Sequence, residues 1–511
     1  MARENNLEEI KIITPLMFCA FFVSISGITY QLIIGGISSY LLGNSIYQFS
    51  ITIGLFMTAL GIGSLFSKYI EEGLMSKFML VETLLGLVGG ITGVLLFYSY
   101  ASSDLYIVIM FLLIISIGSL TGLELPLLTR IIEEYEDLKI TLANVLSADY
   151  IGGLIGSLLF PIILLPNFGF IETSYIMGIL NLIVAGIVYF KYRKRMKLDK
   201  FIGVFLVVIL LSLIFGISTV KSTESYIEQK LYQDNVVYSK QSKYQKIVIT
   251  KDKDDVRLFL NGNIQFSSRD EYRYHESLVH PAMSLVKRRS RILILGGGDG
   301  LAVRELLKYP EIKEIDLVDL DKCMTDLGQS SKYLLKFNQG SLADKRVKIY
   351  NQDAYQYLEE SDKRYNLVIV DLPDPNDESL NKLYTVNFYR MIYDHLANRG
   401  VVVVQSTSPY FASKAFWMIH HTIKKAGFYT RPYHAYLASF GDWGFNLGTK
   451  GFEFEIEDLK VEVDTKFLTT EILPSLFYFG EDILKVRDSV GVNTLTRPTL
   501  IRNYNQAWED Y

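Results

Sequence analysis

Four aspartates stand at the predicted carboxyl ends of strands, where their side chains could act on a cationic substrate. Asp299 lies inside a glycine-rich turn, Asp319 closes the next strand, and Asp371 and Asp374 follow a third, strongly apolar strand. In a doubly wound sheet, ligands bind beyond the carboxyl ends of the strands, so these carboxylates are expected to line one cleft. Such a cleft attracts cations, and one of its carboxylates can accept a proton from an attacking amine.

The segment that must position these aspartates is 291–321, RILILGGGDGLAVRELLKYPEIKEIDLVDLD. Its order predicts a strand (292–295), a glycine turn, a helix (302–308) and a second strand (315–320). Gly296 and Gly298 permit a tight turn and close backbone approach to a ligand. We therefore predict a Rossmann-like α/β domain, of the class I methyltransferase type, over residues 287–511.

A smaller β-rich subdomain is predicted before it, over residues 221–286. Two alternating segments, 244–250 and 256–262, flank the turn-forming sequence KDKDD and predict a β-hairpin. The polar segment after the hairpin contains Tyr274 and His275, which read on their own as part of an ordinary helix start.

Residues 1–220 have the composition of a multi-pass membrane domain of about seven helices. A span needs roughly 20 apolar residues, and seven segments qualify: 13–35, 49–66, 78–98, 105–128, 145–165, 173–190 and 201–220. A buried soluble helix would show a polar face, and 201–217 has none. The lipid bilayer is therefore an expected partner, and the cell membrane the expected location.

The basic residues of the loops predict an orientation. They lie in the second, fourth and sixth loops, the sixth containing Lys194, Arg195 and Lys197, whereas the odd loops have none. The positive-inside rule places the amino terminus and the even loops in the cytoplasm, and seven crossings then place the carboxyl-terminal half outside. A carboxyl-terminal half outside the cell could not reach a cytosolic donor. A re-entrant segment, such as 29–43, would remove this conflict, so the side of the membrane on which this half lies stays open.

Two acidic residues within the predicted spans need a reason, because a mid-bilayer carboxylate costs about 2.5–3.5 kcal/mol. Glu124 and Asp149 either line a path for a cationic solute such as a polyamine, or lie near span ends and pair within the bundle. Their closeness to loops favours the second reading. Glu82 lies closer still to a predicted helix end.

Composition excludes other classes of partner. The formal net charge is −4 over 511 residues, and no basic stripe indicates a nucleic-acid partner. The two cysteines, Cys19 and Cys323, are too few and too differently placed for a disulfide framework or a metal site. No metal and no cofactor is therefore expected.

Seven short sequences occur together in the order and spacing typical of one enzyme family: SKYQKI, LNGNIQ, DEYRYHE, GGGDG, the strand that ends in Asp319, QDA and VDLPDP. From about Tyr226 onward, the chain resembles the spermidine synthases, or polyamine aminopropyltransferases. The first half, with DEYRYHE and GDWGF, resembles the multi-pass membrane branch of that family.

The resemblance implies that an aminopropyl group passes from decarboxylated S-adenosylmethionine to a diamine, usually putrescine, leaving methylthioadenosine. It implies Asp371 as the proton acceptor. The nucleoside donor would contact Gln245, Gly296, Gly298, Asp299, Asp319, Asp353 and Ala354, and the polyamine would contact Tyr274, His275, Asp299, Asp371 and Asp374. His275 would have to be a neutral imidazole to accept from an ammonium. A homodimer is expected by resemblance only.

The position of Asp299 distinguishes this donor from ordinary S-adenosylmethionine. A methyltransferase donor keeps a carboxylate near the glycine turn, which an aspartate would repel, whereas the decarboxylated donor presents only an ammonium. The alternative is a purely structural role, in which Asp299 caps the following helix.

Several residues depart from the family pattern. Asp319 replaces a glutamate, Asn261 replaces the aspartate of LDG, and Leu301 replaces a glycine. An aromatic segment containing Phe440 and Trp443 replaces the acceptor loop of the soluble enzymes. Either these two rings flank the methylene chain of the diamine and Asp442 lies at one amine, or, equally, all three residues belong to the core packing. The acceptor amine therefore stays open.

Two other functions fit parts of the sequence. An S-adenosylmethionine methyltransferase would use the same fold. A polyamine transporter or sensor would use the synthase-like domain only to bind its ligand; Glu124, Asp149 and the size of the apolar half suggest this function.

Overall fold

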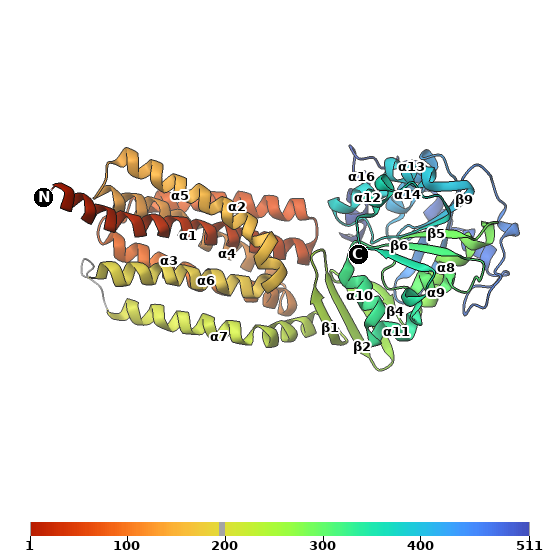
Figure 1. The fold of residues 1–511 in the computed structure, drawn as a ribbon, viewed down its shortest axis with the longest axis horizontal. Helices are drawn as coiled ribbons and strands as arrows, with labels where there is room; N and C mark the ends of the chain where they lie inside the picture. The colour runs from red at the N-terminus through yellow and green to blue at the C-terminus, as the bar shows by residue number, and fades with distance from the viewer. Residues whose placement is uncertain (1, 194–199, 510–511) are drawn as a thin grey trace. The chain divides into compact units, whose positions relative to one another are not determined.

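The computed structural model describes residues 2–193 and 200–509. The chain divides into two compact units, Met1–Asp234 and Asn235–Tyr511, the first helical and the second α/β (Figure 1). The predicted basic residues Lys194, Arg195 and Lys197 lie outside the described residues.

The first unit is a bundle of long helices. They are α1 (Ala2–Leu42), α2 (Ser45–Ser67), α3 (Leu74–Ser102), α4 (Tyr106–Glu133), α5 (Leu138–Leu159), the π-helix Phe160–Leu164, α6 (Leu165–Tyr192) and α7 (Lys200–Leu231). Helix α1 is continuous as far as Leu42, so the segment 29–42, which could have hidden a re-entrant piece, is one unbroken helix. Helix α7 continues past the predicted end at Val220.

Six of the described helices are long and apolar enough to cross a membrane, judged by length and composition. The longest, Leu138–Tyr192, has 55 residues and contains two of the seven predicted segments. It is interrupted at Gly169, whose φ of 69° and ψ of −172° are not helical, and α5 and α6 run in opposite directions (Figure 1). The chain thus makes seven passes through the bundle.

Small residues set the spacing of the helices. A Cβ added at Gly122 would lie 2.2 Å from the Leu60 carbonyl oxygen, and one at Gly63 would lie 2.0 Å from that of Ser119. Helices α2 and α4 therefore approach backbone to backbone, as small residues allow between helices in an apolar environment.

The second unit begins with a four-stranded antiparallel sheet rather than the predicted two-stranded hairpin. Its strands, β1 (Asn235–Gln241), β2 (Lys246–Asp252), β3 (Asp255–Leu260) and β4 (Asn263–Ser267), pair in chain order. Strands β2 and β3 match the prediction. Strand β1 was missed because it is a largely exposed edge strand, and β4 because it is short and polar.

A seven-stranded sheet forms the rest of the unit, with the order β10-β11-β9-β8-β5-β6-β7. Its strands are β5 (Arg291–Gly296), β6 (Glu314–Val318), β7 (Val347–Tyr350), β8 (Tyr365–Asp371), β9 (Leu396–Gln405), β10 (Tyr429–Leu437) and β11 (Gly441–Thr449). All neighbours are parallel except the two pairs that include β11. This confirms the predicted Rossmann-like, methyltransferase-type domain.

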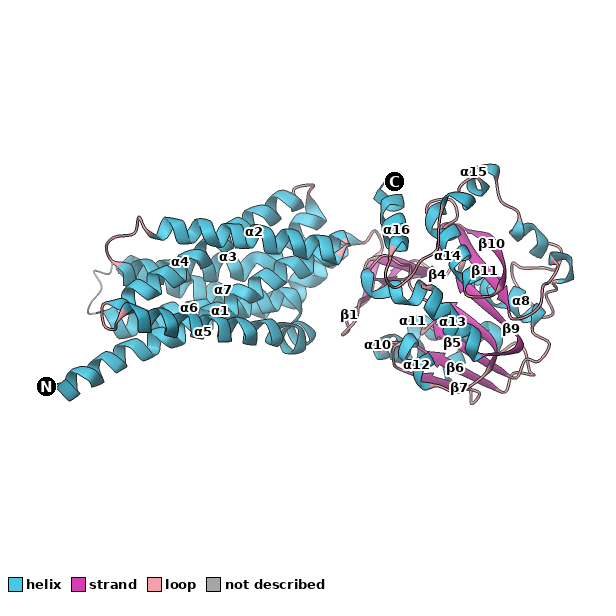
Figure 2. Cartoon of the chain, turned by 90° about the horizontal axis from the view of Figure 1, so that it is seen from above, coloured by secondary structure: helices cyan, strands magenta, loops and turns pink. Residues whose placement is uncertain are grey.

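Helices cover both faces of this sheet (Figure 2). They are α8 (Glu271–Leu285), α9 (Leu301–Leu306), α10 (Lys322–Ser330), α11 (Lys332–Asn338), α12 (Ala354–Glu360), α13 (Val386–His395), α14 (Ser413–Lys425), α15 (Glu481–Leu484) and α16 (Thr499–Glu509). Alternate residues of β5 enter different cores: Ile292 faces the side of α8, and Leu293 faces the side of α13 and α14.

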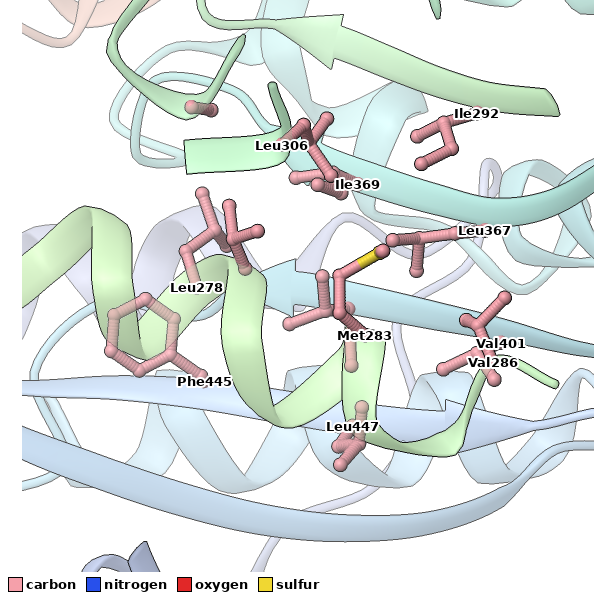
Figure 3. Packing of buried hydrophobic residues seen from close by; sticks show 14 of the residues in the cluster. Leu278, Met283, Val286, Ile292, Leu306, Leu367, Ile369, Val401, Phe445 and Leu447 are labelled. Carbon is pink, nitrogen blue, oxygen red and sulfur yellow. The ribbon is translucent and has the colours of Figure 1, made fainter. Parts of the chain in front are cut away.

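Helix α8 packs directly on the sheet centre, which fixes the residues at its start over the strand ends. Leu278 and Met283 of α8 lie among Leu367, Val401 and Phe445 (Figure 3). These side chains are fully buried, and burying each such apolar side chain contributes about 1.5–3 kcal/mol.

Candidate active site

The glycine turn lies against the end of the neighbouring strand. Gly296 and Gly297 have φ of 88° and 67°, values that favour glycine. A Cβ at Gly296 would lie 2.0 Å from the Asp371 carbonyl oxygen, and one at Gly297 would lie 3.3 Å from Asp371 Oδ2. The turn therefore leaves room for the Asp371 side chain, and a larger residue would close that room.

Asp319 is tied to the same turn from the other side. The Gly298 N–H donates to Asp319 Oδ2 at 3.0 Å, and the Asp321 N–H donates to Oδ1 at 2.9 Å. A Cβ at position 298 would lie 2.6 Å from that carboxylate. Burial raises the pKa of Asp319 to about 6.

Asp299 joins the turn to helix α9. Its Oδ1 accepts a hydrogen bond at 2.9 Å from the N–H of Leu301, the first residue of α9. The N-cap position itself is Gly300, so Asp299 supports the start of the helix with one oxygen from the residue before the cap. Burial raises the pKa of Asp299, and the facing His275 ring opposes that shift. Capping and ligand binding are compatible here, because they use different oxygens.

Asp371 accepts a hydrogen bond from the hydroxyl of Tyr274, which lies 2.6 Å from its Oδ1. Burial raises the pKa of Asp371 to about 6; His275 and the Tyr274 hydrogen bond lower it, and the Asp299 charge raises it. Asp299, His275 and Asp371 therefore interact electrostatically with one another. The start of α8, the glycine turn and the end of β8 meet at this point.

His275 has a different environment from the one expected. Its Nδ1 lies 2.7 Å from the Glu271 carbonyl oxygen and 3.0 Å from Glu271 Oε2. Burial lowers the pKa of His275, but the Glu271 hydrogen bond and charge outweigh it, and the net pKa is raised above 6.5. Since Nδ1 donates to Glu271, a neutral ring would have its acceptor lone pair on Nε2, and the neutral imidazole stays a prediction.

Glu271 is itself held by Arg304 of α9. The guanidinium donates to both carboxylate oxygens at 2.8 and 2.9 Å. Burial would raise the pKa of Glu271, but the hydrogen bonds and charges of His275 and Arg304 lower it to about 2. This bidentate pair fixes the start of α8 against the first helix of the Rossmann-like domain.

Asp374 has three hydrogen-bond donors, none of which the sequence analysis named. Gln405 Nε2 donates to its Oδ1 at 3.2 Å, and Thr407 Oγ1 and the Tyr504 hydroxyl donate to its Oδ2 at 3.0 and 2.9 Å. Burial raises the pKa of Asp374 to about 6, and these three bonds oppose the shift. Thr407 is fully buried with a φ of 56°, a strained conformation for a β-branched residue of the kind found at functional sites.

The remaining predicted donor contacts are engaged with protein groups. Gln245 donates through Nε2 to Asp321 Oδ2 at 3.0 Å, which joins the small sheet to the end of β6. Asp353 caps α12 and pairs with Lys382 Nζ at 2.6 Å. Ala354 is buried at the start of that helix.

For the aromatic segment, the sequence left open whether Phe440, Asp442 and Trp443 contact the diamine or pack in the core. Asp442 pairs with His434 Nδ1 at 2.6 Å, so its charge is used within the segment. Trp443 packs against the core that includes α8, and its ring centroid lies 5.3 Å from that of Phe440.

Asn261 has a φ of 49° and accepts a hydrogen bond from the Lys246 N–H. Asparagine tolerates this backbone conformation, which accounts for its presence at this position.

The fold and the site together define a class of protein. The methyltransferase-type sheet has a glycine turn, a carboxylate at the ribose position and further half-buried carboxylates at the strand ends. This arrangement is typical of enzymes that transfer a group from a nucleoside donor, here to a cationic acceptor. Residues 271–458 match the spermine/spermidine synthase domain family.

Similar proteins extend this match to nearly the whole chain. The polyamine aminopropyltransferase of Oceanobacillus iheyensis is 41% identical over 505 residues, covering 96% of each chain. That of Leptospira interrogans is 42% identical over 496 residues, covering 97% of this chain and 99% of its own. The chain belongs to the polyamine aminopropyltransferase family, and it is an enzyme of the alkyl-transferring class.

Solved structures similar to the chain include the spermidine synthase of Thermotoga maritima and a spermidine synthase in complex with the transition state analogue AdoDATO. Each is 28% identical, with a TM-score of 0.46, and the alignment covers 50% of this chain and 88% of the other.

Proposed function

We propose that this enzyme transfers the aminopropyl group of decarboxylated S-adenosylmethionine to putrescine, giving spermidine and methylthioadenosine. The observation that carries the proposal is Asp299, a half-buried carboxylate within the glycine turn that interacts electrostatically with Asp371 and His275. An ammonium is the group that such a carboxylate attracts, and the decarboxylated donor presents one there.

On the donor side, Asp319 takes the ribose hydroxyls, and Asp353 with Ala354 contacts adenine. Gln245 acts next to Asp321, so its contribution is to hold the small sheet beside the nucleoside. Lys382 would have to release Asp353 when adenine binds. The Gly298 N–H fixes the Asp319 carboxylate in advance, which lowers the entropy lost on binding.

The acceptor is held by Asp374, supported by Gln405, Thr407 and Tyr504. Its reacting amine must be neutral, and the amine nitrogen attacks the carbon next to the sulfonium. A C–N bond forms, the C–S bond breaks with its electrons going to sulfur, and methylthioadenosine leaves uncharged. The proton lost by the attacking nitrogen goes to Asp371, which Tyr274 orients.

The test is product formation by the detergent-solubilised full chain. With putrescine and the decarboxylated donor, methylthioadenosine and spermidine should appear in equal amounts. With ordinary S-adenosylmethionine in its place, binding should be weaker and no methylated product should form. Donor binding without methylthioadenosine release from any diamine would refute the proposal.

We also propose that the first unit is a multi-pass domain of the cell membrane. The support is the set of long apolar helices and their close packing through glycines. The lipid bilayer is then a partner of the chain. A homodimer belongs to the same proposal on the family resemblance alone, and light scattering of the solubilised protein tests it.

A further inference from the structure

Two glutamates are fully buried among the apolar helices of the first unit. Glu82 of α3 and Glu124 of α4 have 0% exposure. Asn181 of α6 donates through Nδ2 to Glu82 Oε2 at 2.9 Å, and the Tyr30 hydroxyl of α1 donates to Asn181 Oδ1 at 3.0 Å. Four helices thus contribute to one polar cluster. The sequence analysis expected Glu124 to lie near a span end or to pair within the bundle, and the structure shows the pairing.

Three carboxyl oxygens in this cluster lack a protein donor among the described residues. They are Oε1 of Glu82 and both oxygens of Glu124. The two carboxyl groups lie within hydrogen-bonding reach of each other, a contact that is a bond only if one group carries a proton. Two ionised carboxylates at this distance in an apolar setting would repel strongly.

No described group nearby supplies a compensating positive charge. The ionisable groups in electrostatic contact with the pair are Cys19 and Tyr30 of α1 and Asp149 of α5. Helix α2 contains no Asp, Glu, Lys, Arg or His, and α7 contains none over 201–220. A bound cation is therefore needed to offset the repulsion between the two carboxylates.

We propose that Glu82 and Glu124 form a proton-binding site in which the two carboxyl groups share one proton. The proton is the cation that fits, since the two side chains are in hydrogen-bonding contact and three of their four oxygens are enclosed without another partner. Asn181 holds Glu82 as the acceptor of that shared bond. Helices α1, α3, α4 and α6 are joined through the site, so their packing depends on proton concentration, as at the ionisable sites of proton-coupled membrane proteins.

Carbodiimide labelling of the full chain in detergent tests the proposal directly. Dicyclohexylcarbodiimide reacts with a carboxyl group that carries a proton in an apolar setting. We expect mass spectrometry to find the adduct on Glu82 or Glu124 at neutral pH, with a yield that falls severalfold as the pH is raised. Exposed Glu133, on the same helix as Glu124, is the internal control and should stay unmodified. No adduct on either buried glutamate at any pH would overturn the proposal.

A second measurement uses Glu124→Gln, whose amide donates permanently and replaces the protonated acid. The folded wild-type pair keeps a proton that unfolded glutamates release at neutral pH, so raising the pH lowers its melting temperature. In E124Q this pH dependence should be lost, whereas in the matched control E133Q it should follow the wild type. An E124Q melting temperature that falls with pH as steeply as that of E133Q would contradict a shared proton.

Discussion

At the residue scale, the site consists of half-buried carboxylates whose pKa values are raised toward neutrality. Burial places the pKa values of Asp319, Asp371 and Asp374 near 6. A carboxylate of this kind is still mostly ionised at pH 7, yet it is a better proton acceptor than an ordinary aspartate. Bound ammonium groups would lower these pKa values again, because an opposite charge favours the ionised form.

The pH dependence of kcat/KM follows from these values. Asp371 must be ionised to accept the proton, and Asp374 must be ionised to hold the acceptor ammonium. Because their pKa values are raised, protonation begins well above the usual range for aspartate, and kcat/KM should fall as the pH drops through about 6. Initial rates at subsaturating putrescine measure this; a rate unchanged between pH 7 and pH 5 would contradict it.

At the element scale, the carboxyl-terminal helix α16 supports the acceptor end of the site. It contributes Tyr504, whose hydroxyl donates to Asp374 at 2.9 Å and lowers the pKa of that carboxyl. None of the motifs that carried the family resemblance lies in this helix, so the resemblance did not indicate that the helix would return to the site.

Tyr504→Phe should weaken acceptor binding and shift the pH profile. Loss of one hydrogen bond to a charged group costs about 1.5–3 kcal/mol, equivalent to roughly a 10-fold or larger rise in the KM for putrescine. Because that bond lowers the pKa of Asp374, its loss should also move the acidic limb to higher pH. Tyr436→Phe, at an exposed tyrosine of β10, is the matched control. A variant with an unchanged acidic limb would mean that Tyr504 only fills space.

The elements that the sequence predicted well are those with a strong local signal. The strand at 292–295 is a continuous apolar segment followed by a clear glycine turn, and the strand that ends at Asp371 contains four consecutive apolar residues at 367–370. Edge strand β1, short strand β4 and the contacts of Thr407 and Tyr504 depend on tertiary packing, which no local pattern records. The contact of His275 with Glu271, and through it with Arg304, was missed for the same reason.

At the scale of the whole molecule, seven passes place the start of α1 and the end of α7 at opposite ends of the helical unit. The basic second loop would lie in the cytoplasm by the positive-inside rule. The requirement of the enzyme for a cytosolic donor favours the same side for the carboxyl-terminal half, so the topology of the chain needs direct measurement.

Reporter fusions in cells provide that measurement. If all seven passes cross the bilayer, a reporter in the loop at Glu72 and one after the last residue should report opposite sides. Accessibility of engineered cysteines at the same positions is an independent check. Reporters on the same side would show that one pass does not cross the membrane.

The central claim is that Asp371 accepts the proton of the attacking amine, and Asp371→Asn tests it most directly. The amide keeps the shape and the contact with Tyr274 but cannot act as the base. We predict that kcat falls by about 100- to 10,000-fold, while the Kd of the decarboxylated donor, measured by calorimetry on the solubilised full chain, changes by less than about 10-fold. Equal losses in turnover and donor affinity, or turnover that stays near the wild-type value, would contradict that role.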